Sequence, residues 1–305
     1  MDIDVANPSA PIVVGIGEAL FDMFDGDARL GGAPLNVAVH AHRLLQRAGV
    51  GRGVVVSRVG DDELGERIAA ALGREGMTAE YLQQDEKLET GKVTVNKSGG
   101  SHTFHIERDA AWDAIAWSDS LSSLAKSVSA VAFGSLAQRE TKSRDTIQRF
   151  VAEASDAIRL FDVNLRASDG TNYFNRDVLC RGCELADYVK LNDEELETVN
   201  RLTGTDSAES LLAQFDLKAV IFTRGAEGTA AYTADGFLEG QPGRPESVHP
   251  DADTVGAGDA CSAALLAALV RGADLKPALD FANQVAAQVA HLPGATPRLP
   301  DSIRL

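Results

Sequence analysis

The chain has 305 residues, of which 44% are hydrophobic and 24% charged, so its composition is that of a globular protein with a large core. Its formal net charge of -16 argues against a nucleic-acid or anionic-membrane partner, because phosphate-rich surfaces are bound through Lys and Arg. The longest apolar run is too short to cross a bilayer, and the acidic N-terminus lacks an apolar signal core. These features predict a cytoplasmic protein.

The first half of the chain predicts strands that alternate with helices. PIVVGIGEALFDMF, from residue 11, opens with a buried-type strand, and GGAPLNVAVHAHRLL, from residue 31, is typical of a helix that follows glycines. GVVVSRVGDDELGERIAAAL, from residue 53, then predicts a strand, a turn and a helix. Between about residues 88 and 106 the texture changes to short alternating runs split by NKSGG, which indicates a β-hairpin.

The second half returns to the strand and helix rhythm. AVAFGSLA, IRLFDVNLR, ADYVKLN and AVIFTRG predict strands, with helices near residues 141 to 154 and 175 to 186 between them. TAAYTADG and FLEGQP predict a terminal hairpin or meander, and two apolar helices close the chain. Strands separated by helices indicate an α/β fold with a mainly parallel sheet covered on both faces. The hairpin after residue 88 does not fit that layer, so we expect it to form a small β lid with residues near 18 to 30.

The motif DTVGAGD, residues 253 to 259, directly precedes an Ala- and Leu-rich helix that ends near Arg271 and Gly272. The free N–H groups of the first helical turn would meet any anion, and Gly256, Ala257 and Gly258 have almost no side chain to obstruct it. Asp259 could equally be an ordinary first-turn acid.

Polar residues also follow the predicted strands. In open parallel sheets ligands bind beyond the carboxyl ends of the strands, so these residues predict a cleft. They are Glu18, Asp22, Asn164, Arg166, Asn192 to Glu195, Thr223 and Gly225. The pairs His40 and His42, and His102 and His105, lack companion ligands and are interpreted as ordinary polar residues.

Taken together, these motifs resemble the ribokinase-like, or PfkB, family of carbohydrate kinases. DTVGAGD resembles its C-terminal signature, GGAPLNVA with VGDDELG resembles its N-terminal one, and VKLNDEE matches a third element. TRGAEG, ANQVAAQVA and PGATP follow in the family's order, so the likeness runs from about Ile12 to Pro300. The resemblance implies a ribokinase-like three-layer sandwich, formed by a single domain over residues 1 to 305, with a lid from about 18–30 and 88–112.

The resemblance also implies transfer of the ATP γ-phosphoryl group to a sugar hydroxyl. Asp259 would be the catalytic base, beside an anion hole formed by the backbone of Gly256, Ala257 and Gly258. Because a helix N-terminus stabilises a carboxylate, we expect Asp259 to be ionised at neutral pH and a weak base. The implied ATP-binding residues are Lys190, Asn192, Thr223, Gly225, Gly228 and Asn283.

Two cations are implied by the same resemblance. Asn192 and Glu195 would hold Mg²⁺ through water, although an Asn and a Glu three residues apart also fit a helix capping box. The ligands of K⁺ would be the Asp253 carboxylate and the carbonyls of Val255, Val289, Leu292 and Gly294. Arg298, after the last proline of that loop, is a cation that could displace K⁺.

The implied sugar-binding residues favour fructose. They are Asp22, Gly32, Asn36, Arg108, Asn164 and Arg166, with Arg108 in the place of a lid arginine. A carboxylate facing the substrate suits a neutral polyol, whereas a 2-keto-3-deoxygluconate kinase, the nearest alternative, would need more cations. Trp112 departs from the fructokinase pattern and predicts a reshaped pocket.

Alternatives from other classes also stay open. A catalytically inactive nucleotide-binding regulator could share the fold, but the intact GAGD disfavours it. A dehydrogenase is disfavoured because Leu20 replaces the third glycine of G-x-G-x-x-G. The apolar face of the lid strands suggests a homodimer.

Overall fold

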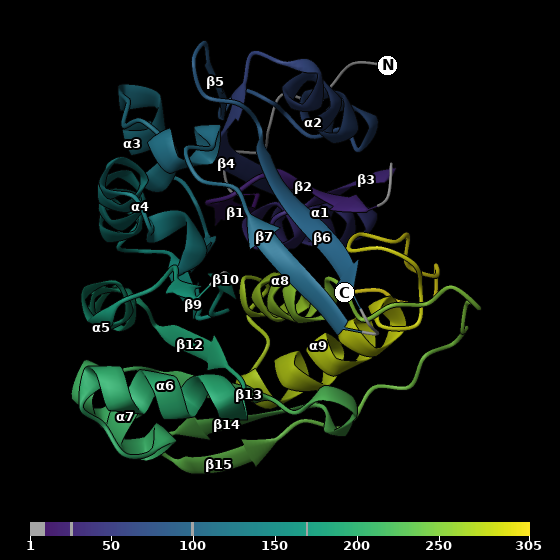
Figure 1. Cartoon of the computed structure of the whole chain (residues 1–305). Helices are drawn as coiled ribbons and strands as arrows, with labels where there is room; N and C mark the ends of the chain where they lie inside the picture. The colour runs from purple at the N-terminus through teal and green to yellow at the C-terminus, as the bar shows by residue number, and fades with distance from the viewer. Residues whose placement is uncertain (1–9, 25–26, 99–100, 169) are drawn as a thin grey trace.

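The computed structural model describes residues 10–24, 27–98, 101–168 and 170–305. Most of the acidic N-terminal segment, which contributed to the prediction of a cytoplasmic protein, lies outside these ranges. Within them, the larger sheet has nine strands in the order β15-β14-β13-β12-β9-β8-β1-β4-β5 (Figure 1). Its strands are β1 Ile12–Ile16, β4 Arg52–Gly60, β5 Leu82–Asp85, β8 Ala130–Gly134, β9 Ile158–Asp162, β12 Tyr188–Leu191, β13 Ala219–Thr223, β14 Thr229–Thr233 and β15 Gly236–Glu239.

Neighbouring strands of this sheet are parallel from β13 across to β5, whereas β14 and β15 run antiparallel at one edge. The expected mainly parallel sheet with a hairpin at its edge is therefore confirmed. Because the carboxyl ends of the parallel strands meet at one edge of the sheet, the polar residues that follow them are brought to the same side.

Helices cover both faces of the sheet. One face carries α1 Ala33–Arg47, α8 Ala257–Leu269 and α9 Leu275–Val289 (Figure 1). The other carries α3 Asp119–Ala125, α4 Thr141–Glu153, α5 Arg176–Leu185, α6 Asp193–Thr203 and α7 Ala208–Phe215, and α2 Glu63–Arg74 packs beside β4. The helices expected near 141 to 154 and 175 to 186 are thus α4 and α5.

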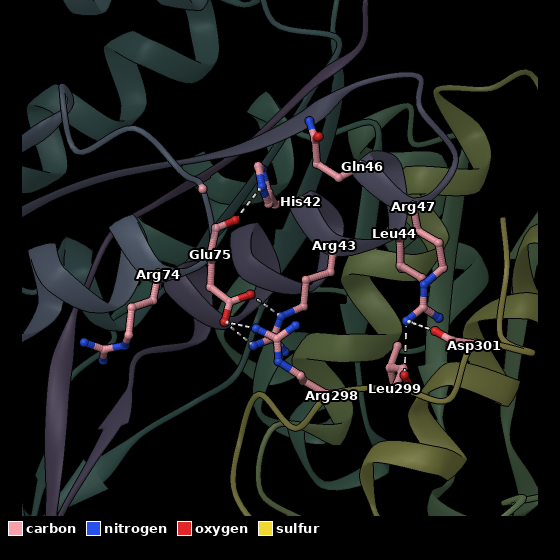
Figure 2. A pocket seen from close by; sticks show the side chains of 11 residues that line it. His42, Arg43, Leu44, Gln46, Arg47, Arg74, Glu75, Arg298, Leu299 and Asp301 are labelled. Carbon is pink, nitrogen blue, oxygen red and sulfur yellow. Dashed lines mark hydrogen bonds and ion pairs between the residues drawn. The ribbon is translucent and has the colours of Figure 1, made fainter. Parts of the chain in front are cut away.

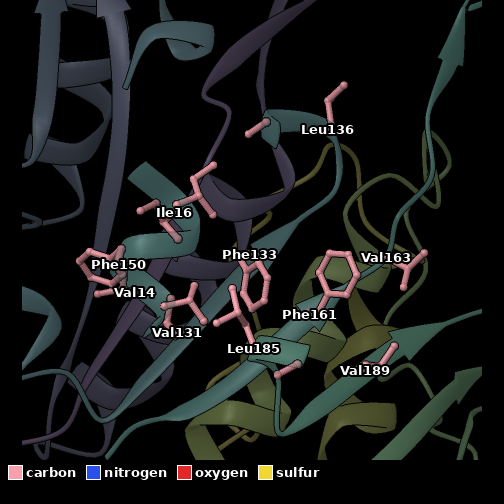
Figure 3. Packing of buried hydrophobic residues seen from close by; sticks show 14 of the residues in the cluster. Val14, Ile16, Val131, Phe133, Leu136, Phe150, Phe161, Val163, Leu185 and Val189 are labelled. Atoms are coloured by element: carbon pink, nitrogen blue, oxygen red, sulfur yellow. The ribbon is translucent and has the colours of Figure 1, made fainter. Parts of the chain in front are cut away.

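Alternate strand residues supply the two cores, as the two-residue period of a strand requires. Val13 packs with α1, α8 and α9, whereas Val14 packs in the core on the opposite face. In that second core the rings of Phe133 and Phe161 stack with their centroids 5.1 Å apart (Figure 3). Strands buried on both faces explain the nearly continuous apolar runs of the sequence.

A second, four-stranded sheet lies apart from the first, in the order β3-β2-β6-β7 (Figure 1). It consists of β2 Leu20–Phe24, β3 Asp27–Gly31, β6 Gly91–Ser98 and β7 Ser101–Ile106. β2 pairs antiparallel with β3 and parallel with β6. These are the two segments from which a lid was expected.

Trp112 lies in the core of the protein. It lies in the short helix η1 Ala111–Ala114, is 1% exposed and belongs to the core, so it cannot line an open pocket. The guanidinium of Arg139 lies 4.0 Å from the centre of its ring and forms a buried ion pair with Asp113. The expectation that Trp112 reshapes the substrate pocket stays a prediction, because a buried ring can act on a pocket only through its neighbours.

The remaining short elements are β10 Ala167–Ser168 and β11 Thr171–Asn172, which pair with each other, and the 3₁₀ helices η2 Leu136–Gln138 and η3 Gly225–Glu227. In the described ranges no helix combines the length and the apolar character that crossing a bilayer requires.

Candidate active site

The N-terminus of α8 begins at the residues of the GAGD motif. Gly256 is the N-cap and has a left-handed backbone with φ of 77°. A β-carbon at this position would lie 2.2 Å from the Ala295 carbonyl oxygen, so only glycine fits. A β-carbon on Gly258 would instead meet only the Lys190 Nζ, at 3.7 Å. Gly256 thus fixes the start of the helix, whereas Gly258 keeps space open beside an ammonium group.

One of the three expected anion-hole amides is already engaged. The Ala257 N–H donates to the Thr254 carbonyl at 3.3 Å, a long hydrogen bond. The first turn still presents the positive end of α8 to the cleft.

Asp259, in the first turn of α8, is held by Asn36 of α1. The Asn36 Nδ2 donates to the Asp259 Oδ2 at 2.8 Å, across 223 residues of sequence. Desolvation and the neighbouring Asp162 raise the pKa of Asp259 to about 6, although the hydrogen bond from Asn36 lowers it. Asp259 is therefore mostly ionised at neutral pH, as expected, but it is a stronger base than the helix terminus alone predicted.

A buried ion pair lies next to this carboxylate. The Lys190 Nζ, at the end of β12, lies 2.6 Å from the Asp162 Oδ2, and both side chains are less than a tenth exposed. The Ser262 hydroxyl of α8 donates to the same Asp162 oxygen at 3.0 Å. Desolvation lowers the pKa of Lys190, but Asp162 and other neighbours more than offset this and leave it raised. Lys190 is thus a fixed positive charge beside Gly258.

Two further acids, Glu18 and Asp22, are acted on by the same cation, Arg166, as Asp259. Glu18, directly after β1, is 4% exposed, and its Oε2 has no hydrogen-bond partner among the described residues. Desolvation raises its pKa to about 7, and Asp259 adds to the rise. Desolvation also raises the pKa of Asp22, on β2, to about 6. The Asn36 Oδ1 is likewise buried without a described partner, so this end of the site offers acceptors for hydroxyl donors.

Gly31 and Gly32 allow the segment before α1 to lie close to Asp22 and to the backbone of Glu18. A β-carbon on Gly31 would lie 2.7 Å from the Asp22 Oδ2, and one on Gly32 would lie 2.4 Å from the Glu18 carbonyl oxygen. Gly32 also has φ of 108°, a conformation that other residues rarely adopt. The predicted sugar-binding role of Gly32 stays a prediction, since this geometry concerns contacts within the protein.

The other predicted sugar-side residues differ in their placement. The positive charge of Arg166 lowers the pKa of Glu18, Asp22 and Asp259, so Arg166 lies within electrostatic range of all three. Asn164, two residues earlier, has a positive φ of 39°, a strained conformation of the kind found at functional sites. Arg108 is exposed, lies 5.8 Å from the ring centre of Tyr173 and has no described contact with Asp22 or Asp259.

Asn192 and Glu195 form the capping box that their spacing also allowed. The Asn192 Oδ1 accepts from the Glu195 N–H, and the Glu195 Oε2 accepts from the Asn192 N–H. The Glu195 Oε1 also accepts from the Leu165 N–H at 2.8 Å, which ties α6 to the loop after β9. Desolvation and Asp162 raise the pKa of Glu195.

The pair still fits a hydrated Mg²⁺. No cluster of three or more His, Cys, Asp or Glu able to hold a metal occurs within the described part of the chain. Mg²⁺ keeps several waters and is commonly bound by one or two carboxylates and by substrate phosphates, and each carboxylate oxygen retains a free lone pair.

The predicted nucleotide residues come together beside β13. Thr223 ends this strand, η3 includes Gly225, and a β-carbon on Gly228 would lie 2.8 Å from the Asn283 Nδ2 of α9. Asn283 is 3% exposed, accepts from the Thr229 hydroxyl and donates to the Gln241 carbonyl. Its amide therefore joins α9 to the start of β14 and to the segment after β15.

The residues expected to bind K⁺ partly adjoin one another. The Asp253 N–H donates to the Leu292 carbonyl, and the Asp253 Oδ2 accepts from the Gly294 N–H. The Val289 carbonyl accepts from the Leu292 N–H, and the Val255 N–H donates to the Asp253 Oδ1.

Arg298 is 77% exposed and lies 3.4 Å from Glu75 instead, so it does not reach Asp253. The cation beside Asp253 is Arg29 of β3, at 3.6 Å from the Oδ2. The expectation that Arg298 is the cation that could displace K⁺ is therefore wrong.

Sequence reasoning missed several residues of the site. Glu18 was noted only as a polar residue after a strand, and Asp162 and His40 were given no role. His40 is fully buried, and its Nε2 lies 3.0 Å from the Ala295 carbonyl oxygen, in the loop that packs against Gly256. Desolvation lowers the pKa of His40 to about 4, so it is neutral and its Nε2–H donates. Two sequence signals could have pointed to them. Asp162 lies at the end of a predicted strand, just before the candidate residue Asn164, and His40 is a polar residue within the apolar pattern of α1.

Comparisons with known proteins agree with this geometry. The model of the pfkB family carbohydrate kinases matches residues 17–302. A fructokinase of Klebsiella pneumoniae is 32% identical over 93% of this chain and 95% of its own length. An ATP-dependent 6-phosphofructokinase of Thermoanaerobacterium thermosaccharolyticum is 29% identical over 95% of this chain and 91% of its own.

Solved structures place the fold in the same group. A crystal structure of fructokinase from Vibrio cholerae O395, in fructose-, ADP- and calcium-bound form, superposes with a TM-score of 0.76 at 29% identity. The alignment covers 94% of this chain and 95% of that one. The fold is thus the ribokinase-like α/β fold, and the chain belongs to the pfkB family of carbohydrate kinases, as a sugar kinase.

Proposed function

We propose that this sugar kinase transfers the γ-phosphoryl group of ATP to a hydroxyl of fructose at Asp259. The observation that carries the proposal is the 2.8 Å hydrogen bond from Asn36 to Asp259. Asn36 lies on the sugar side, and its Oδ1 is buried without a described partner. Asp259 lies in the first turn of α8, on the phosphate side. A hydroxyl that donates to this pair would face the helix terminus.

In the proposed mechanism Asp259 accepts the proton of the attacking hydroxyl, and Asn36 holds the carboxylate in line. A pKa near 6 suits this role, because the carboxylate is mostly ionised at neutral pH yet basic enough to take a proton late in the reaction. The N–H groups of Gly256 and Gly258, with Lys190, would stabilise the charge of the moving phosphoryl group, and that of Ala257 would join them if it exchanged its long hydrogen bond to Thr254 for one to the phosphoryl group. When bound through water to Asn192 and Glu195, Mg²⁺ would neutralise charge on the ATP phosphates.

The balance of charge favours a neutral sugar. Glu18 and Asp22 line the sugar side, and Arg166 is the cation that acts on both of them. An acceptor with its own carboxylate or phosphate, such as 2-keto-3-deoxygluconate or fructose 6-phosphate, would be repelled unless further cations joined the site. The fructose bound to the Vibrio cholerae relative supports the same choice.

The four-stranded sheet is proposed to act as a lid over the sugar. β2 carries Asp22, and β3 carries Arg29, which pairs with Asp253 beside α8. Closure would exclude water, which otherwise competes with the sugar for the phosphoryl group. The whole chain would then act as one kinase domain, and a homodimer through this sheet is part of the proposal.

A panel of acceptors tests the function. The protein is mixed with ATP and Mg²⁺ and with fructose, 2-keto-3-deoxygluconate, fructose 6-phosphate, ribose or a nucleoside, and ADP release is followed. We expect the highest kcat/KM with fructose and a loss of roughly 10²- to 10⁴-fold in kcat for Asp259→Asn, with ATP affinity retained. A higher kcat/KM for an anionic acceptor would refute fructose, and ATP binding without turnover on any sugar would support an inactive regulator.

A further inference from the structure

A cavity of about 440 Å³ lies beside the second half of α1, and we call it the arginine pocket (Figure 2). The second half of α1, the end of α2 and the segment from residue 298 to 301 enclose it. Its lining residues are His42, Arg43, Leu44, Gln46, Arg47, Arg74, Glu75, Gly76, Arg298, Leu299 and Asp301. Asn36 and Arg43 are seven residues apart on α1, so the pocket begins about 10 Å along the helix from Asp259.

The charge of this pocket is opposite to that of the chain. Four arginines line it against two acids, whereas the chain as a whole carries a formal charge of -16. One acid, Glu75, is already neutralised: the Arg43 Nε and Nη2 donate to its two oxygens at 2.8 and 2.9 Å. The hydrogen bond from Arg43 and its charge hold the pKa of Glu75 below its usual value. The other, Asp301, is 94% exposed and lies 3.4 Å from Arg47, so water screens this contact.

Backbone carbonyls hold two of the guanidinium groups in addition to the contacts with acids. The Arg43 Nη1 donates to the carbonyls of Thr296 and Pro297, and Arg47 donates to those of Leu299, Pro300 and Ile303. Arg74 has no hydrogen bond or ion pair to any described residue, and Arg298 reaches Glu75 only at 3.4 Å (Figure 2). Two arginines are therefore preorganised, and two more are available to a ligand.

We propose that the arginine pocket is a second ligand site, which binds a phosphorylated small molecule and regulates turnover. Guanidinium groups match phosphate oxygens with two parallel hydrogen bonds each, and Arg74 and Arg298 have N–H groups that can be used in this way. The volume suits a small metabolite. None of the lining residues has a Phe, Tyr or Trp ring on which a nucleobase could stack, so the expected ligand is an organic phosphate without a base.

The pocket reaches the catalytic centre through a short loop. Arg43 holds the carbonyls of Thr296 and Pro297, and His40, one turn earlier on α1, holds the carbonyl of Ala295. Ala295 is the residue against which Gly256 packs at the start of α8. An anion that draws Arg298 and Arg43 toward itself would therefore move the loop that sets the anion hole.

The test compares two double variants of matched charge. Arg74→Ala with Arg298→Ala removes the available arginines, and Arg201→Ala with Arg271→Ala removes two exposed arginines elsewhere. Inorganic phosphate and glycerol 3-phosphate are titrated by calorimetry at constant ionic strength, with chloride as the reference anion. The affinity is expected to fall by about tenfold or more in the first variant and to stay unchanged in the second. It should also persist in Gly258→Val, in which the anion hole of the catalytic site is blocked.

A kinetic measurement completes the test. Glycerol 3-phosphate is expected to change kcat of the wild type without competing with ATP or sugar, and to leave kcat of the Arg74 and Arg298 variant unchanged. Equal binding by both double variants, no binding by the wild type, or loss of binding in Gly258→Val would overturn the site. Binding with an unaltered kcat would overturn its regulatory role.

Discussion

Replacing Asn36 by alanine tests the link between the sugar side and the base. The change removes the 2.8 Å hydrogen bond from Asn36 to Asp259. In the wild type this hydrogen bond lowers the pKa of the Asp259 carboxyl group. A hydrogen bond to a charged group contributes about 1.5–3 kcal/mol, and water can replace part of it because Asp259 is not fully covered. We therefore expect the pKa of Asp259 to rise from about 6 by roughly one unit, which corresponds to about 1.4 kcal/mol.

The assay is kcat as a function of pH, at saturating ATP and sugar. With a pKa of about 6, the ionised fraction of Asp259 is about half at pH 6, and it falls to roughly a tenth if the pKa rises by one unit. At about pH 8 the two fractions differ by only about a tenth. The variant should therefore lose about fivefold more activity relative to the wild type at pH 6 than at pH 8.

Asn283→Ala is the matched control, because Asn283, like Asn36, is a buried asparagine. Its two side-chain hydrogen bonds lie on the nucleotide side instead. It should raise KM for ATP and leave the acid limb of the kcat profile in place. An Asn36→Ala profile parallel to that of the wild type at every pH would refute the idea that Asn36 tunes Asp259.

Three further predictions follow from the geometry of the site. Gly258→Ala should fold normally and lower kcat, whereas Gly256→Ala should lower the melting temperature, because only the second β-carbon meets backbone; equal melting temperatures would contradict this. Glu18→Gln should be more stable than the wild type by up to about 3 kcal/mol near pH 8 and should gain nothing near pH 4, as measured by urea unfolding. The sign follows because the pKa of Glu18 is raised to about 7, so its contribution to stability is lost as the pH rises through that value. Arg29→Ala should increase the activation of kcat by KCl over NaCl, and an unchanged ratio would argue against competition at Asp253.

The fold could be predicted from the sequence because its signals are local. Apolar runs of strand length, helical periodicity and the glycine-rich motif each depend on a few consecutive residues, and they placed α8, α4 and α5 correctly. Trp112 shows the limit of local reading. Whether a large ring lines a pocket or fills the core depends on Arg139 and Gly91, and neither contact can be recognised from the residues around position 112.

The electrostatics of the site could not be read from the sequence for a related reason. A helix N-terminus favours the ionised carboxylate, and this local effect predicted a weak base at Asp259. Desolvation and the charge of Asp162 act in the opposite direction and are stronger, but both arise from the packing of β9 against α8. Glu18 was underestimated in the same way, because its raised pKa depends on burial.

Helix α1 explains how distant parts of the chain are fixed relative to one another. Asn36, His40, Arg43 and Arg47 follow at intervals of four, three and four residues, so they share one face of the helix. Their partners are Asp259 and then, in order, carbonyls of residues 295 to 303. The spacing is visible in the sequence, but it does not show that the partners lie more than 220 residues away. One rigid helix thus contacts both the base and the loop behind the anion hole. Because Ala295 of that loop packs directly against Gly256, a displacement of the C-terminal segment would change the position of Gly256 more than that of the sugar-binding residues.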